Sequence, residues 1–349
     1  TGTQNVAVGA LAGDAQTTGS HSVAVGYNAL TANTTANYNV AIGRNSLAAN
    51  TTTAYNTAVG GESLAANTAA SNTAVGYAAL TANTTGASNV AVGTYALDAN
   101  TTASNNVAIG HNAMTTSTSA GNGVAIGWEA LKDLTTGSEN IAIGRSTSED
   151  ITTGIRNIAI GGYALNTNTT SNYNVAVGYT ALQVNTASNN TAVGHETLKA
   201  NTSGTDNVAV GSNSLDANTT GSDNTAIGDN ALGANTTASD NVAIGADALL
   251  VNTTGSDNVS VGFNSLVANT TGSTNVAIGK DALDSNTTAS DNVAVGTDAL
   301  QANTTGANNI AIGRSAMDGN TTASDNVGIG YRSLFANTTG TDNVAVGAN

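Results

Sequence analysis

The chain has 349 residues, of which 40% are apolar, 3% aromatic and 9% charged. So few aromatic side chains argue against a thick globular core, and the absence of Cys excludes disulfides and thiolate metal sites. The formal net charge of −15 argues against nucleic acid or an anionic membrane as a partner. No stretch approaches the roughly 18 consecutive apolar residues of a membrane span, so we expect no membrane contact by this segment.

A pentad of the type Asn-Val-Ala-Val-Gly recurs along the whole chain. Its glycine returns every 17 residues from Gly9 to Gly347, except for two 16-residue steps at Gly60–Gly76 and Gly178–Gly194. A fixed period over the full length is typical of stacked repeats. The sequence therefore predicts one continuous tandem-repeat solenoid over residues 1–349, with about twenty coils.

Within each repeat we number the positions 1 to 17 from the Asn of the pentad. Positions 2 and 4 hold Val, Ile or Thr, a β-branched alternation of period two, and Gly at position 5 permits a turn with positive φ. Leu follows at position 9, and a stretch of the type Asn-Thr-Thr-Gly-Ser-Asp is typical of turns. We expect an all-β parallel β-solenoid with two short strands per coil, and the complete absence of Pro is consistent with stacked strands.

The pleat places the side chains of positions 2 and 4 on one face, which we expect to point inward toward the Leu of position 9. The predicted core residues are Val107, Ile109, Leu215, Leu232 and Leu249. Glycines such as Gly228 and Gly245 are predicted to form the turns that end the strands.

Position 3 points to the opposite face and is Ala almost throughout. A solvent-facing position should drift among polar residues, so a column of small residues indicates that another surface approaches closely. We expect chain-to-chain packing on this face, for example at Ala226 and Ala243. The alternative is a flat exposed sheet on which small residues merely suit the turn.

Asn residues recur at positions 1 and 12 and should stack from coil to coil. Amides one above another can hydrogen-bond along the axis, so Asn218, Asn235 and Asn252 are predicted to form a ladder. Between residues 106 and 156 the pattern loosens, because Ser117, Leu134 and Ile151 occupy position 12. This irregular zone could be a kink, a changed turn, a local contact site or drift in a redundant array.

Asp occupies position 17 in four consecutive coils, at Asp206, Asp223, Asp240 and Asp257. Carboxylates about 5 Å apart repel one another, and bound Ca²⁺ would relieve that repulsion. The repeat differs from the glycine- and Asp-rich type that binds Ca²⁺ in other solenoids, and Asp before Asn is ordinary turn usage. Weak Ca²⁺ sites and solvated turns both remain open, and no other cofactor is expected.

No catalytic constellation is apparent. His21, His111 and His195 fall on different coils and form no Ser–His–Asp or metal grouping. The Thr pairs at positions 13 and 14 raise ice binding, but adjacent strand residues point to opposite faces. The Asn-Thr-Thr segments also match the glycosylation sequon. We predict no enzymatic activity.

The Asn-Val-Ala-Ile-Gly pentad at residues 106–110, 241–245 and 275–279 resembles the head repeat of YadA-like trimeric autotransporter adhesins. Similar repeats occur in phage tail fibres and bacterial surface fibres, and the resemblance covers essentially the whole chain. It implies a left-handed β-roll, three of which pack side by side in a non-enzymatic adhesive head. It also implies that Val107 and Ile109 lie inside the roll and that Ala108 lies near the neighbouring chains.

These features together predict a structural protein that forms a rigid extracellular fibre or adhesin shaft, on a bacterial cell surface or a virion. The expected partners are further copies of the chain, as a trimer or an end-to-end filament, and a host-surface or matrix glycan. The alternative is a binding module that holds glycan, Ca²⁺ or ice along a repetitive face, or a phage tail-fibre segment.

Overall fold

The computed structural model describes residues 2–348, which contain strands and turns and no helix. In this part of the chain no helix is therefore available to cross a membrane. The chain divides into two compact units, Thr1–Asn174 and Val175–Asn349, and each is a β-solenoid of 17-residue coils. Positions 1 and 349 of the predicted solenoid lie outside the described residues.

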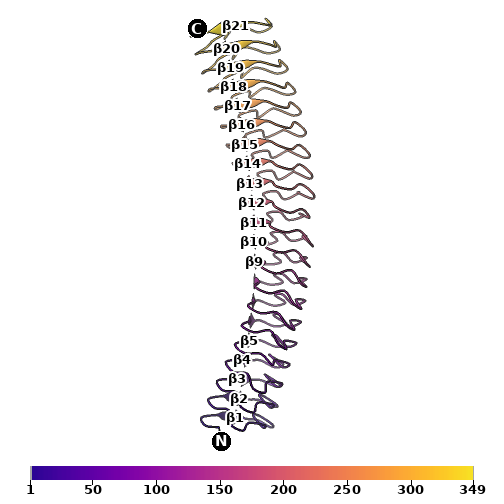
Figure 1. The fold of residues 1–349 in the computed structure, drawn as a ribbon. Coiled ribbons are helices and arrows are strands. Elements are labelled where there is room, and N and C mark those ends of the chain that lie inside the picture. Colours follow the sequence, from indigo (N-terminus) through magenta and orange to yellow (C-terminus); the bar gives the residue numbers. More distant parts are fainter. Residues whose placement is uncertain (1, 349) are drawn as a thin grey trace. The chain divides into compact units, whose positions relative to one another are not determined.

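Every coil contributes one three-residue strand (Figure 1). The strands of the first unit are β1 (Val6–Val8), β2 (Val23–Val25), β3 (Val40–Ile42), β4 (Thr57–Val59), β5 (Thr73–Val75), β6 (Val90–Val92), β7 (Val107–Ile109), β8 (Val124–Ile126), β9 (Ile141–Ile143) and β10 (Ile158–Ile160). Those of the second are β11 (Val175–Val177), β12 (Thr191–Val193), β13 (Val208–Val210), β14 (Thr225–Ile227), β15 (Val242–Ile244), β16 (Val259–Val261), β17 (Val276–Ile278), β18 (Val293–Val295), β19 (Ile310–Ile312), β20 (Val327–Ile329) and β21 (Val344–Val346).

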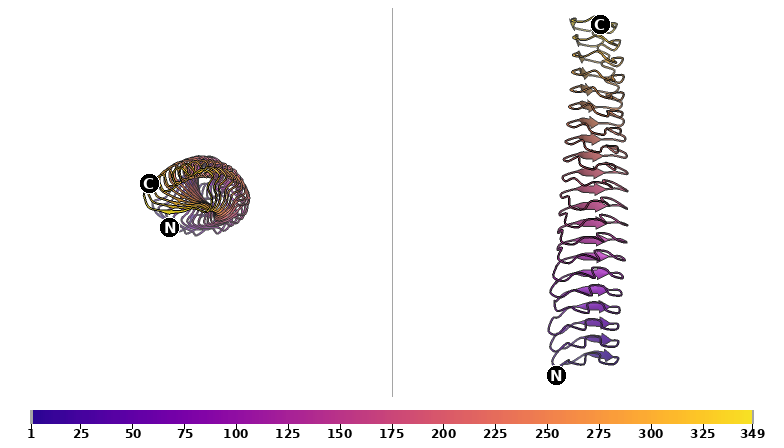
Figure 2. Two further views of the ribbon diagram at one scale, coloured as in Figure 1. Left: turned by 90° about the horizontal axis from the view of Figure 1, so that it is seen from above. Right: turned by 90° about the vertical axis from the view of Figure 1, so that its right-hand side faces the viewer.

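Within each unit, every strand pairs in parallel with the strand of the next coil (Figure 2). The register is the same throughout, so that Ala226 of β14 lies beside Ala243 of β15. The 16-residue steps keep this register, because Thr57 of β4 still faces Thr73 of β5. Each repeat position therefore forms a column, and the predicted parallel solenoid is confirmed. Its left hand stays a prediction.

The Leu side of the coil is a turn, where the sequence predicted a second strand. In the coil of residues 224–240, Asn230 and Leu232 both have a φ of 53°, in the left-handed region. Their amides still bond to neighbouring coils: Leu232 N donates to Ala248 O (3.0 Å), and Asn230 N to Ser212 O (3.0 Å). The backbone is thus satisfied between coils without strand geometry, and the chain can close a narrow coil.

The direction of the pleat is the reverse of the one expected. The Ala of position 3 points inward and is fully buried, as at Ala108, Ala226 and Ala243, so these residues are not an outer packing face. Val107 is only half-buried and Ile109 is 37% exposed, so the prediction that they fill the core is wrong. The interior is narrow, and the Leu of position 9 crosses most of it. Only a small side chain fits opposite that Leu.

Leu215, Leu232 and Leu249 form part of this inner Leu column and are fully buried. Two departures from Ala at position 3 show how closely the interior is packed. At Gly328, a Cβ would lie 2.8 Å from Cγ of Met317, which replaces the usual Leu. At Ser260, the hydroxyl donates to Ser265 O (2.8 Å), so the polar group is satisfied inside the coil. The change to Gly328 is thus matched by the Met that it faces, and the hydroxyl of Ser260 is satisfied by a backbone carbonyl.

The Asn columns also lie inside the coil. Asn235 is fully buried, donates to Asn218 Oδ1 (2.9 Å) and accepts from Asn252 Nδ2 (3.4 Å). The column at position 1 joins the same turn, because Ala238 O accepts from both Asn224 Nδ2 (2.9 Å) and Asn235 Nδ2 (3.1 Å). The predicted amide ladder therefore links the Thr-rich turn of each coil to the adjacent coils through hydrogen bonds.

The irregular zone keeps the strand pairing of the rest of the first unit, through β7, β8 and β9. Its change lies in the interior: Leu134 and Ile151 are fully buried where the Asn ladder would continue. Asn100 Oδ1 and Ser117 Oγ, where the ladder stops, are buried without a hydrogen-bond partner. In this zone buried apolar side chains thus replace the buried Asn side chains of position 12, and the fold of the coils is unchanged.

Candidate functional site

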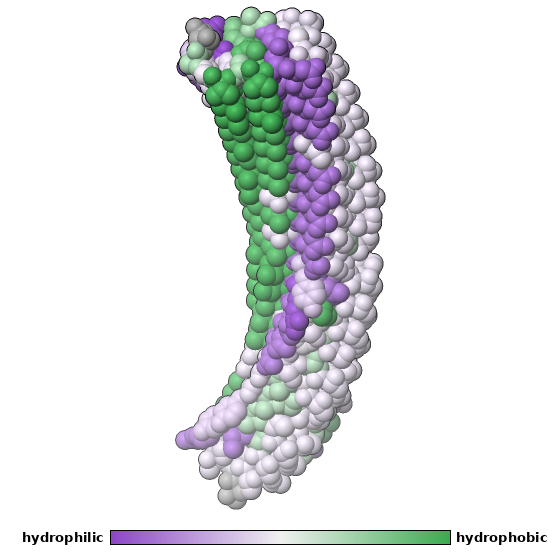
Figure 3. All heavy atoms as spheres, turned by 45° about the horizontal axis from the view of Figure 1, so that its top comes forward, coloured by the Kyte–Doolittle hydropathy of each residue, from purple (hydrophilic) through white to green (hydrophobic). Residues whose placement is uncertain are grey.

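Each unit carries an apolar strip, which we define as the side chains of the first and third residues of the strands. Several are more than a third exposed: Ile42, Val75, Ile109 and Ile160 in the first unit, and Val208, Ile227, Ile244, Ile278, Ile310 and Ile312 in the second. In Figure 3 this strip appears in green along the strands of the second unit. Contiguous apolar surface of this extent is uncommon on monomeric soluble proteins.

The Thr side chains at position 13 form hydrogen bonds with the backbone of the next coil. At position 13 the hydroxyl donates to the carbonyl of the equivalent Thr one coil further on, as from Thr236 Oγ1 to Thr253 O (3.2 Å) and from Thr253 Oγ1 to Thr270 O (3.0 Å). In many coils, such as that of Thr236 and Thr237, only the second Thr is exposed, whereas both are exposed at Thr51–Thr52 and Thr84–Thr85. The position-13 hydroxyls are therefore engaged along the stack, which leaves the second Thr of each pair as the more accessible row. The sequon residues Asn33, Asn100 and Asn303 are fully buried.

The Asp residues of position 17 lie on exposed turns. Asp206, Asp223, Asp240 and Asp257 all have φ between 58° and 60°, a conformation that Asp adopts more readily than most residues. Further along this column, Thr274 Oγ1 donates to Asp291 Oδ1 (2.6 Å). Within residues 2–348 no three His, Asp or Glu side chains gather in a metal-binding group.

The edge that follows the Gly turn carries most of the ring contacts of the first unit. Tyr77 and Tyr95 meet edge to face with centroids 5.7 Å apart, and Tyr95 meets His111 at 6.5 Å. Next along the edge, the Arg145 guanidinium lies 5.3 Å from the ring centroids of both Trp128 and Tyr163. This row is not apparent along the sequence, because each contact joins residues 16 to 18 positions apart.

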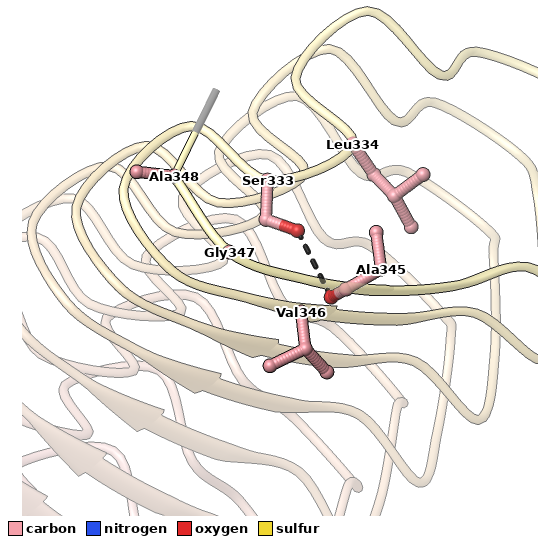
Figure 4. Close-up of a pocket in the computed structure, with 6 residues that line it drawn as sticks. All are labelled: Ser333, Leu334, Ala345, Val346, Gly347 and Ala348. Atoms are coloured by element: carbon pink, nitrogen blue, oxygen red, sulfur yellow. Dashed lines mark hydrogen bonds between the residues drawn. The ribbon is translucent and has the colours of Figure 1, made fainter.

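The three His residues lie apart. His21 stacks on Tyr38 (4.9 Å) in a column that continues to Tyr55, and His195 stacks on Tyr179 (5.8 Å). No catalytic grouping forms around any of them. A hollow of about 200 Å³ lies beside β21, lined by Ser333, Leu334, Ala345, Val346, Gly347 and Ala348 (Figure 4). It is the interior of the last described coil, where Ser333 Oγ donates to Ala345 O (3.1 Å), and it contains no ionisable side chain.

Four aspartates at position 10 are partly buried beside the Leu turn. Burial raises the pKa of the carboxyl groups of Asp98, Asp216, Asp284 and Asp318. Nearby carboxylates add to this increase in pKa at the last three, for example Asp281 beside Asp284. Ionised carboxylates at these sites oppose folding, because the unfolded chain hydrates them better.

We expect the variant D216N/D284N/D318N to be more stable than the wild type at pH 7, with the difference shrinking toward pH 4. The folded chain binds protons more tightly at these groups than the unfolded chain does. The ionised carboxylates therefore destabilise the wild type at neutral pH. This loss of stability disappears as the pH falls through their raised pKa values, down to the unfolded value of 3.8. Urea unfolding at both pH values measures this difference. An equal advantage of the variant at both would contradict the burial argument.

No protein-family model matches the chain, and no characterised protein matches its sequence.

Proposed function

We propose that the chain is a non-enzymatic structural protein that builds a rigid extracellular fibre or adhesin shaft by stacking its coils and by associating with further copies of itself. A regular β-solenoid is typical of structural repeat proteins, in which each repeat contacts only its neighbours. The observation that carries the proposal is the apolar strip. Parallel sheets occur almost only with both faces covered, and here one face is covered by the coil interior while the other is open.

A second copy of the chain is the partner that fits this strip best. The strip repeats a pair of β-branched side chains once per coil, with a spacing of about 4.8 Å. Side chains with this spacing interdigitate along their whole length only with a surface of the same period. Another copy of the solenoid provides that surface, as paired sheets do in steric zippers. Self-association is therefore assigned to positions 2 and 4, in place of the Ala column.

The area is sufficient for a stable assembly. Each unit has ten or eleven strands of three residues, which give a strip of about 10 by 50 Å. Two copies that meet over both units would bury on the order of 2,000 Å², at the upper end of the standard range for specific interfaces. A trimer with three strips around a common axis would use the same residues.

We expect the double variant I227K/I244K to associate at least tenfold more weakly than the wild type in sedimentation velocity, with an unchanged circular dichroism spectrum. Each substitution places a charge in the strip. The matched control T237K/T254K adds the same charge at exposed positions of the same two coils and should associate like the wild type. A monomeric wild type, or equal association of both double variants, would refute the proposed interface.

The surface location and the adhesive role are part of the same proposal. The resemblance to adhesin and fibre repeats supports them, and so does the repetitive surface that the coils of each unit present. Whether the fibre belongs to a cell or a virion is answered by finding the protein with an antibody on intact cells or purified particles.

A further inference from the structure

The edge that follows the Gly turn in the first unit holds one arginine between two aromatic rings. Arg145 Cζ lies 5.3 Å from the centroid of Trp128 in the preceding coil and 5.3 Å from that of Tyr163 in the following coil. Trp128 is 44% exposed and Arg145 is exposed as well. The guanidinium is therefore attracted to both rings while Arg145 remains exposed to solvent.

The repeat itself builds this arrangement. Trp128 and Arg145 follow the turn glycines of β8 and β9 at position 6, so they lie one above the other. In the next coil position 6 is Gly162, and the ring comes from Tyr163 at position 7. Backbone bonds keep the coils aligned here, from Ser146 N to Trp128 O (2.9 Å) and from Tyr163 N to Arg145 O (3.0 Å). The three side chains of this contact thus come from three successive coils, and no two of them are neighbours in the sequence.

Arg145 also lacks the acidic partner that the other basic residues of this unit have. Arg44 pairs with Glu62, Lys132 with Glu149 and Arg156 with Glu139, at 2.6 to 3.1 Å. None of the ion pairs among residues 2–348 includes Arg145.

The acid nearest in sequence to Trp128 is already engaged. Glu129 Oε1 accepts from Asn112 Nδ2 (3.5 Å) and lies 3.9 Å from Lys132 Nζ. In a chain of net charge −15, a guanidinium between aromatic rings and without an acidic partner has the features of a site for an external anion.

We propose that Trp128, Arg145 and Tyr163 form a binding site for a carboxylate-bearing saccharide, specifically a uronic acid within a linear oligomer. The guanidinium would hold the sugar carboxylate through two parallel N–H···O bonds. The exposed part of the Trp128 ring would pack against the C–H face of a pyranose ring, the apolar surface that such rings offer to aromatic side chains. The site thus recognises the acid group and the ring together.

The row of rings beyond this site favours a polymer over a single sugar. Tyr77, Tyr95 and His111 occupy the same edge in the three coils before Trp128. Six consecutive coils therefore each contribute a ring or the guanidinium, with a step of about 4.8 Å. A linear saccharide advances by a similar step per ring and could lie along this edge. Its contacts with the flanking rings would add to the affinity at Arg145.

Fluorescence can report on this site directly, because Trp128 is the only tryptophan in the chain. We expect titration of the full-length protein with an oligogalacturonate to change the emission saturably. The variant R145Q should bind at least tenfold more weakly, and R145K should be intermediate, since it keeps the charge but loses the planar fork. Isothermal titration calorimetry should give the same order and extends the test to W128A.

Two controls make the result specific. R314Q removes an exposed arginine from the same repeat position in the second unit, and it should bind like the wild type. The methyl-esterified oligogalacturonate, which keeps the rings and loses the charge, should bind at least tenfold more weakly. The assembly variant I227K/I244K should bind normally, so failure of self-association and failure of this site are distinguishable.

Three results would overturn the proposal: no saturable binding, equal binding by R145Q, or equal binding of a polyglutamate peptide. The last result would assign the site to acidic polypeptides, such as the Asp columns of another copy.

Discussion

Replacing Gly228 by alanine should lower the free energy of unfolding by about 3 kcal/mol or more, as measured by urea denaturation of the full chain. Gly228 has a φ of 141°, which other residues rarely adopt. A Cβ there would also lie 2.4 Å from the carbonyl oxygen of Gly245 in the next coil. That atom belongs to the backbone of the coil stack, so relief requires the two coils to move apart. Hydrogen exchange should show the greatest loss of protection in β14 and β15.

Gly233→Ala is the matched control, because it makes the same chemical change in the same coil. Gly233 lies at position 10, where other coils carry Asp, Leu or Gln, and its φ is not positive. The nearest atom to an added Cβ is Asn230 O at 3.3 Å, and the next is the end of the Leu250 side chain at 3.4 Å. We expect a change within about 1 kcal/mol. Equal destabilisation by the two substitutions would show that the turn geometry is not the cause.

Asn235→Asp should destabilise the chain by about 3 to 5 kcal/mol at pH 7, although the two side chains have nearly the same shape. The amide nitrogen of Asn235 donates to Asn218 Oδ1 and Ala238 O, both of which are acceptors. A carboxylate would put a buried charge against these two oxygens. Urea unfolding monitored by circular dichroism gives the difference in stability.

The loss should be smaller at pH 4, which separates the buried charge from the lost hydrogen bonds. Burial raises the pKa of such a carboxyl in the folded state, so stability returns as the pH falls through that value. Asn308→Asp adds the same charge at an exposed position of the Asp column and should cost less than about 1 kcal/mol. A loss from N235D that is equal to that of N308D would contradict the role of the ladder.

The repeat pattern specifies the period, the parallel stacking and the columns, because a fixed period admits only one register. It does not specify which face of the strand is inside. The alternation of side chains along a strand places Val107 and Ile109 on one face and Ala108 on the other. It does not say which face points into the coil, and hydrophobicity alone favours burying the larger side chains. The width of the coil decides otherwise, since the Leu of position 9 and the Asn columns already occupy the interior.

One detail of the sequence carries a signal for this direction. Met317, which replaces the Leu of position 9, occurs with Gly328, which replaces the Ala of position 3 in the next coil. This paired change indicates contact between the two positions. No such signal in the sequence shows that each coil has one strand and not two. Leu232 has a positive φ, which the choice of Leu at this position does not indicate.

The row of rings around Arg145 was hidden for a different reason. Trp128 is the only tryptophan, yet Arg145, which contacts it, lies 17 residues further on, and Tyr163, which contacts Arg145, lies another 18 residues on. Once the coils stack in register, residues that are one repeat apart in the sequence lie in contact. Residues at equivalent positions of successive repeats should therefore be compared down the columns as well as along the chain.

The measurement that tests the proposed assembly most directly is a cryo-electron microscopy cross-section of the assembled protein at a resolution that separates individual coils. We predict that neighbouring chains meet at their Val and Ile strips, with the Ala columns enclosed within each roll. Strips that face solvent in the assembly, or chains that meet through other faces, would contradict this account.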